Sequence, residues 1–214
     1  MSQDRQFAHS LPAIGKTLTF FALNCFLCGC SVPAKAPTSA APVAGQGTVL
    51  VRVSTAGLIN MSSFGITAKA VGKDEKINFN GWSMASEGYW SKTNKNEVKG
   101  QLVAAQLVAG QYEFSTFNAI NSAGLAMGTT TSVKPFSYPF QVRQGEVTYL
   151  GEIHLKFDQK KLPEKGATVE LPLQVVLRDT RAQDFQDVKK LIPDINTDQI
   201  VVRLLASMTP AKAK

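Results

Sequence analysis

The sequence predicts a mainly β domain, an antiparallel β-sandwich of about seven strands with a C-terminal α-helix packed against it. Three observations lead to this prediction. Apolar and polar residues alternate in several short runs, which is the two-residue period of a half-buried strand. Turn-forming glycine and proline residues separate these runs, and helical spacing occurs only near the C-terminus. Short strands joined by turns are typical of a sandwich.

The first strands are predicted by an alternation that begins near residue 47. One face of each is apolar: Val49, Val51 and Val53 in the first strand, and Phe64, Ile66, Ala68 and Ala70 in the second. The first strand presents Leu50, Arg52 and Ser54 on its other face. Residues 72–100 lack a regular pattern, and a further strand is expected at residues 101–106.

The remaining strands are predicted in the second half of the chain. A turn at Ala109–Gly110 leads into a strand at residues 112–118, and a last strand is expected at residues 169–177. Between them, residues 136–142 and 147–157 predict a hairpin around Gln144–Gly145. The second strand of this hairpin has one apolar face: Val147, Tyr149, Gly151, Ile153, Leu155 and Phe157.

Pro139 lies within the first strand of the hairpin. Because proline cannot donate a backbone hydrogen bond, that strand is expected at a sheet edge or at a bulge.

A helix is predicted after the strands. Thr180 and Gln183 fit a capping box, and an apolar stripe precedes Pro193, which ends the helix: Phe185, Val188 and Ile192. Residues 200–205 fit a short helix and a strand equally well. The predicted organisation is a sandwich at residues 47–178, a helical segment at residues 179–208 and a disordered tail at residues 209–214.

The N-terminal region has the layout of an export signal. Arg5 and Lys16 precede an apolar run at residues 18–27, which is shorter than the roughly 20 residues that span a bilayer as a helix. Residues 31–46 are almost entirely Ala, Pro, Ser, Thr, Val and Gly. Such a composition cannot build a core, so residues 30–46 are expected to form a flexible tether.

The apolar run ends in Leu27, Cys28, Gly29 and Cys30, which resemble the lipobox of bacterial lipoproteins. The resemblance implies that residues 1–29 are a signal peptide, that cleavage precedes Cys30, and that its sulfur carries diacylglycerol. Ser31 then implies transport to the outer membrane, so the expected location is the bacterial cell envelope. Metal binding by the three cysteines and an ordinary secretory signal are the alternatives.

Parts of the predicted sandwich resemble a group of uncharacterised bacterial envelope lipoproteins. The matching runs are residues 107–114, 135–140 and 145–153, with a similar helix at residues 178–193. The resemblance implies a domain similar to the transthyretin-like or carboxypeptidase-regulatory sandwich. That group has no established catalytic residues, so none is assigned, and no cofactor or metal is expected.

Charge gives little information about partners. The chain has 23 basic and 16 acidic residues, a net charge of +7, but the lysines are scattered. We therefore expect solvated turns rather than a nucleic-acid surface. The expected partners are the membrane, through the lipid, and an envelope protein or glycan.

The best candidate binding surface is aromatic. Trp82, Tyr89 and Trp90 lie in the irregular stretch, among several asparagines, and suit a sugar ring or a peptide side chain. A satellite core beneath a loop is the alternative. His154 and Glu152 share a face of a predicted strand, where an ordinary surface histidine is expected and a hydrolase site is the alternative.

These observations together favour a non-enzymatic, membrane-anchored lipoprotein that binds another envelope component. A glycan- or cell-wall-binding module and a hydrolase remain the alternative functions.

Overall fold

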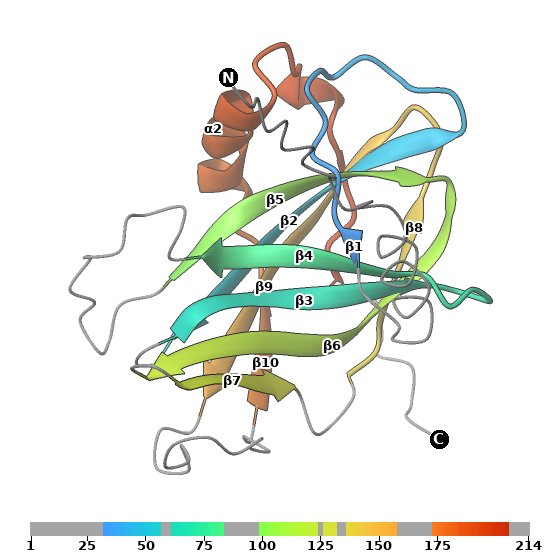
Figure 1. Ribbon diagram of the computed structural model, residues 1–214. Coiled ribbons are helices and arrows are strands. Elements are labelled where there is room, and N and C mark those ends of the chain that lie inside the picture. The colour runs from blue at the N-terminus through green and yellow to red at the C-terminus, as the bar shows by residue number, and fades with distance from the viewer. Residues whose placement is uncertain are drawn as a thin grey trace, which may run out of the picture. The chain divides into compact units, whose positions relative to one another are not determined.

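A computed structural model describes residues 32–56, 61–83, 99–123, 126–131, 136–157 and 173–205 (Figure 1). Within these ranges the protein is mainly β, with two mixed sheets and one α-helix. The predicted signal, cleavage and lipidation residues lie outside the described ranges, as does the predicted tail.

The first sheet, sheet A, has the strand order β1-β4-β3-β6-β7, and β8 pairs with another part of β6. Its strands are β1 (Val32–Pro33), β4 (Lys76–Ser83), β3 (Met61–Ala70), β6 (Gly110–Ala123), β7 (Ala126–Thr131) and β8 (Tyr138–Val142). The strand that contains Pro139 pairs with β6 alone among the described strands, so its predicted edge position is confirmed.

The second sheet, sheet B, has the order β10-β9-β2-β5, with β11 beside part of β9. Its strands are β10 (Leu173–Arg178), β9 (Val147–Phe157), β2 (Gln46–Ala56), β5 (Lys99–Val108) and β11 (Val201–Val202). The antiparallel prediction is wrong, because β2 and β11 both run parallel to β9, and β1 runs parallel to β4. The described strands also exceed the predicted seven.

The main core contains side chains from both sheets. The apolar faces predicted for the first two strands are confirmed, since Val49, Val51, Val53, Phe64, Ile66, Ala68 and Ala70 are all buried in it. Aromatic rings fill its centre: Phe114 stacks on Phe140 with centroids 4.5 Å apart, and Phe79 meets Phe114 edge-on at 5.2 Å. Such offset and edge-to-face contacts add to the burial of apolar area.

The outer face of sheet B is buried as well, beneath α2 (Arg181–Leu191), which Figure 1 shows beside β5 and β2. Val188 and Ile192 pack there on Leu50, Leu102 and Tyr149. The predicted helix and its packing are therefore confirmed. The capping box is not, because the side chain of Thr180 makes no capping hydrogen bond.

A β-bulge determines which residues of β9 face the helix. Leu50 pairs with Tyr149 and Arg52 with Glu152, so β9 has one extra residue, and Gly151 there has φ of 92°. A glycine tolerates this left-handed conformation. The bulge reverses the alternation, so Tyr149 lies in the outer cluster and Ile153 in the main core. The prediction that Tyr149 and Ile153 share a face is wrong.

The turn at Gln144–Gly145 is present, but the predicted hairpin is wrong. The strand before it, β8, pairs with β6 in sheet A, whereas β9 pairs with β2 and β10 in sheet B. The turn therefore carries the chain from one sheet to the other. It is held to β2 by hydrogen bonds from the Gly145 amide to the Gln46 carbonyl (2.8 Å) and from the Thr48 amide to the Glu146 carbonyl (2.9 Å).

The pattern missed one strand and left one region undecided. The irregular stretch contains β4, whose buried residues Ile77 and Phe79 alternate with Asn78 and Asn80. Asparagine is depleted in strands, so the pattern was weak. The ambiguous residues near position 200 form a 3-10 turn, Thr197–Gln199, followed by β11.

The segment predicted as a flexible tether is packed against the domain from Val32 onward, so that part of the prediction is wrong. The Ala34 amide donates to the Asn78 carbonyl of β4, and the Gln106 amide of β5 donates to the Lys35 carbonyl, both at 2.9 Å. The segment thus connects an outer strand of each sheet. In Figure 1 it continues as the blue chain from β1 to the start of β2.

Gly47 provides a test of the crossing turn. A Cβ at this position would collide with the main-chain carbonyl of Arg143, whereas a Cβ at Gly110 would meet nothing nearer than 3.8 Å. We expect Gly47→Ala to lower the free energy of unfolding by about 1–3 kcal/mol, the usual cost of overpacking. Gly110→Ala is the matched control and should change it little. Urea denaturation measures both, and equal stability of the two variants would contradict the packing described.

Candidate functional site

Polar side chains lie between sheet B and the helix. Asp184 of α2 is fully buried and accepts three hydrogen bonds: from Arg52 Nε (2.5 Å), the Tyr149 hydroxyl (2.5 Å) and the Thr180 hydroxyl (2.7 Å). A second carboxylate, Asp187, accepts from Arg52 Nη2 at 2.6 Å. These bonds join the two inner strands of sheet B, β2 and β9, to two successive turns of the helix.

This environment shifts the ionisation of two groups. Burial disfavours the charge on Arg52, but the hydrogen bonds and charges of Asp184 and Asp187 outweigh it and raise its pKa. Burial, and then the hydrogen bond to Asp184, raise the pKa of Tyr149. Arg52 therefore stays charged and Tyr149 stays protonated, which suits a structural contact that does not exchange protons.

A second polar cluster lies further along the same face of β2 and β9. Ser54 Oγ is 2.5 Å from Glu152 Oε1 and 2.7 Å from His154 Nδ1, and Arg178 Nη1 is 3.8 Å from Glu152 Oε2. Ser54 and His154 are each only 2% exposed. The shared face of Glu152 and His154 is confirmed, but the expected surface histidine is wrong, because both side chains are buried.

The arrangement of this cluster differs from a nucleophilic triad. A serine hydroxyl has one proton, so when Ser54 donates to the Glu152 carboxylate, it accepts from a protonated His154 Nδ1. In a triad the serine instead donates to the imidazole. Burial, and then Arg178, lower the pKa of His154, which favours the neutral ring. The geometry thus fits a satisfied buried network better than a group that attacks a substrate.

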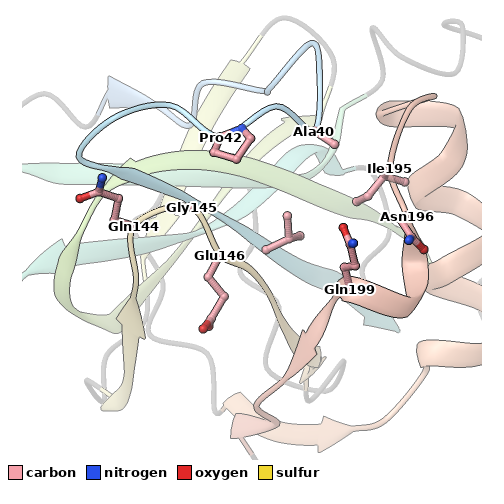
Figure 2. Close-up of a pocket in the computed structure, with 9 residues that line it drawn as sticks. Ala40, Pro42, Gln144, Gly145, Glu146, Ile195, Asn196 and Gln199 are labelled. Carbon is pink, nitrogen blue, oxygen red and sulfur yellow. The ribbon is translucent and has the colours of Figure 1, made fainter.

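A polar pocket of about 320 Å³ is formed by three segments distant in sequence (Figure 2). Its lining residues are Ala40 and Pro42, the crossing turn Gln144, Gly145, Glu146 and Val147, and Ile195, Asn196 and Gln199. Its volume is at the lower end of the range for small-ligand sites.

Hydrogen bonds outside the pocket hold its walls together. The Ser39 hydroxyl and the Ala40 amide donate to Asp194, at 2.6 and 2.9 Å, which joins the N-terminal segment to the loop after α2. The Ser39 hydroxyl, and then the Ala40 amide, lower the pKa of the Asp194 carboxyl. Asn196 Oδ1 accepts from the Asp198 amide at 3.1 Å and so fixes the short turn that carries Gln199.

The acidic residue of the pocket is neutralised. Glu146 is paired with Arg203 through two contacts of 2.5 and 3.1 Å, and Thr148 also donates to it at 2.8 Å. Figure 2 shows its carboxylate pointing away from Pro42. The remaining polar groups are the amides of Gln144, Asn196 and Gln199, beside apolar walls such as Pro42 and Ile195. Because amides both donate and accept, this lining suits an uncharged ligand rich in hydroxyl or amide groups.

A second hollow, of about 260 Å³, lies between the N-terminal segment and β5, near the end of α2. It is mainly apolar and is lined by residues that include Pro33, Pro37, Leu102 and Leu191. Leu191 is an exposed leucine of the helix.

The predicted aromatic surface is only partly within the described residues. The backbone of Trp82 belongs to β4, where it pairs with Phe64, but its side chain is not described. Tyr89 and Trp90 lie outside the described ranges. The pocket residues were missed by sequence reasoning, since Pro42 lies in the expected tether and Gln199 between two elements. The Asn-Thr-Asp run at residues 196–198, a common turn signal, was the only local indication.

No helix among the described residues is long and apolar enough to cross a membrane. No group of three or more His, Cys, Asp or Glu side chains among them is arranged to hold a metal ion.

Comparisons with known proteins give no family. No protein-family model matches the chain, and no curated protein matches it. Among solved structures, a leucine-rich repeat protein from Bacteroides thetaiotaomicron is similar over 71% of this chain and 16% of its own, with 14% identity and a TM-score of 0.33. A similarity of that size assigns neither a fold family nor a function.

Asp184 is expected to be the most sensitive residue of the helix contact. Asp184→Asn leaves Arg52 with a buried charge that lacks its main partner, so we expect a loss of about 3–5 kcal/mol in the free energy of unfolding. Asp179→Asn is the control, because its ion pair with Arg181 is at the surface, and it should have a much smaller effect. Chemical denaturation compares them, and equal losses would contradict the assigned role of Asp184.

His154 is expected to make the domain sensitive to mild acid. Its pKa is lowered in the folded protein from the ordinary 6.5, first by burial and then by Arg178 and Lys156, against the opposing charge of Glu152. The unfolded chain therefore takes up a proton first, so this contribution is fully present above pH 6.5 and is lost as the pH falls below it.

The test is urea denaturation at several pH values on both sides of that transition. His154→Asn keeps a donor near the Nδ1 position without the titration, and its stability should depend less on pH than that of the natural protein. Parallel pH profiles for the two proteins would show that His154 is not responsible.

Proposed function

We propose that the protein is a lipid-anchored component of a bacterial envelope, and that its domain is a non-enzymatic binding module. The observation that supports the binding role is the pocket of Figure 2, with its amide side chains and its neutralised carboxylate. Three separate segments are fixed around it by hydrogen bonds and an ion pair. A site held in place before binding loses less entropy when it takes up a ligand.

An envelope glycan is the ligand that this lining favours. Sugar hydroxyls donate and accept in the same way as the amides of Gln144, Asn196 and Gln199, and the ring of Pro42 offers an apolar surface. The sugar would need no positive charge to balance Glu146, because Arg203 already pairs with that carboxylate.

A protein partner is the second candidate and would use another surface. The apolar hollow beside Leu191 supports it, since exposed apolar surface next to a helix is a common feature of protein contacts. The Trp82, Tyr89 and Trp90 surface stays a further prediction for either partner.

The anchor is supported by the sequence Leu27, Cys28, Gly29 and Cys30 after a short apolar run. The absence of enzymatic activity is supported by the Ser54, Glu152 and His154 cluster, whose members are buried and bonded to one another. A transthyretin-like relationship is consistent with two sheets that share a core, and we retain it as part of the proposal.

Glycan binding is tested by titrating the protein with soluble fragments of purified cell-wall and envelope polysaccharide in a calorimeter. Each of Gln144→Ala and Gln199→Ala should weaken binding by about tenfold, as the loss of one hydrogen bond predicts. Gln183→Ala is the control, because that amide lies on the exposed side of α2. Unchanged affinity in both pocket variants, or no binding by the natural protein, would reject the glycan role.

The anchor is tested by fractionating cells fed with labelled palmitate. Cys30→Ser should lose both the label and the membrane association, whereas Cys28→Ser should keep both, since a small residue is retained there. If the natural protein takes up no label, or if the two variants fractionate alike, the lipid assignment is wrong.

A further inference from the structure

Four turns or turn-like segments are joined at one end of the two sheets. The Val71 amide donates to the Gln111 carbonyl (2.9 Å), the Ala109 amide to the Gly45 carbonyl (2.9 Å), and the Gly145 amide to the Gln46 carbonyl (2.8 Å). These bonds connect residues 71–75, 108–110, 43–46 and 143–146 into one continuous rim.

Exposed valines gather at this rim. Five large apolar residues are exposed in the described part of the chain, and four of them are Val32, Val43, Val71 and Val108. Val43, Val71 and Val108 belong to the rim itself, and Val32 pairs with Ile77, directly after the 71–75 turn. We call these residues and their turns the valine end. Isolated exposed apolar residues are ordinary, but three on one linked rim and a fourth beside it make this the part of the described surface where large exposed apolar residues concentrate.

The start of the described chain lies at the same end. Val32 begins β1, and only residue 31 separates it from Cys30. Two extended residues reach about 7 Å, so a lipid on Cys30 would keep Val32 within about that distance of the bilayer surface. Because β1 is held by β4 and by the Ala34 hydrogen bond, no long tether separates the domain from the anchor.

The charges near the valine end also suit a lipid surface. Lys73, Lys76 and Arg143 are exposed there, against Asp74 and Glu75, and Asp74 is paired with Lys69 at 3.2 Å. Basic side chains beside an anionic leaflet add a weak attraction to the apolar contact.

We propose that the 71–75 and 108–110 side of the valine end lies on the bilayer, with Val71 and Val108 touching its interfacial region and with Gln144 and Gly145, which line the pocket of Figure 2, outside the contact. This inference rests on the lipid attachment proposed for Cys30. The inference adds to that attachment an orientation of the domain, in which the opposite end of the sheets points away from the membrane.

The test uses the full chain, expressed with its own signal, purified from membranes and placed in phosphatidylethanolamine–phosphatidylglycerol vesicles. An environment-sensitive fluorophore is attached to one of three substitutions: Val71→Cys, Val108→Cys or, as the control, Gln174→Cys, which pairs with Lys156 at the end of β9 away from the crossing turn. Val71 and Val108 are 63% and 54% exposed, and Gln174 is exposed too, so each position is open to labelling. Lipids that carry a nitroxide near the headgroup serve as the quencher.

We expect at least twofold stronger quenching at positions 71 and 108 than at position 174. If the protein floats with the vesicles but all three positions are quenched equally, or position 174 most, the orientation is wrong while the anchor stands. If the protein does not float with the vesicles at all, the lipid attachment is wrong and the orientation with it.

Discussion

Strand β2 is buried on both faces, and this constraint explains the buried polar contacts of Arg52 and Ser54. Its Val49, Val51 and Val53 face the main core, so Leu50, Arg52 and Ser54 lie on the opposite face of the sheet, where Leu50 and Arg52 meet the helix. A buried charge or hydroxyl is costly unless it is paired. Helix α2 therefore supplies carboxylates as well as apolar side chains, and β9 supplies Glu152 and His154 for Ser54. Helix α2 thus completes the packing of the outer face of sheet B.

Local structure followed from the sequence better than strand pairing did. Alternation shows which face of a strand is apolar, so the core residues of β2 and β3 could be found without a structure. It does not show which strand lies alongside. Phe140 before the crossing turn and Leu150 after it both enter the main core, but from opposite sheets. A hairpin and a crossing would give the same pattern, and only the long-range pairing of β9 with β2 separates them.

The candidate site was less predictable, because it is assembled from distant segments. Asp184 was not predicted either, although it lies four residues before Val188 on the apolar stripe, where a carboxylate indicates a buried partner. Pro42 and Gln199 gave no such signal. Their proximity depends on the contacts of Ser39 and Ala40 with Asp194, more than 150 residues away. From its composition alone, that N-terminal segment was expected to be a flexible tether.

The packed N-terminal segment also determines how the domain would respond to mechanical load. A pull through the proposed lipid anchor would enter at Val32 and peel the two-residue β1 from β4, then break the Ser39 and Ala40 bonds to Asp194. About fifteen residues would be released before β2 carried any force, a reserve on the order of 50 Å. The segment would then be short at rest, when it is packed on the domain, and would lengthen only under tension.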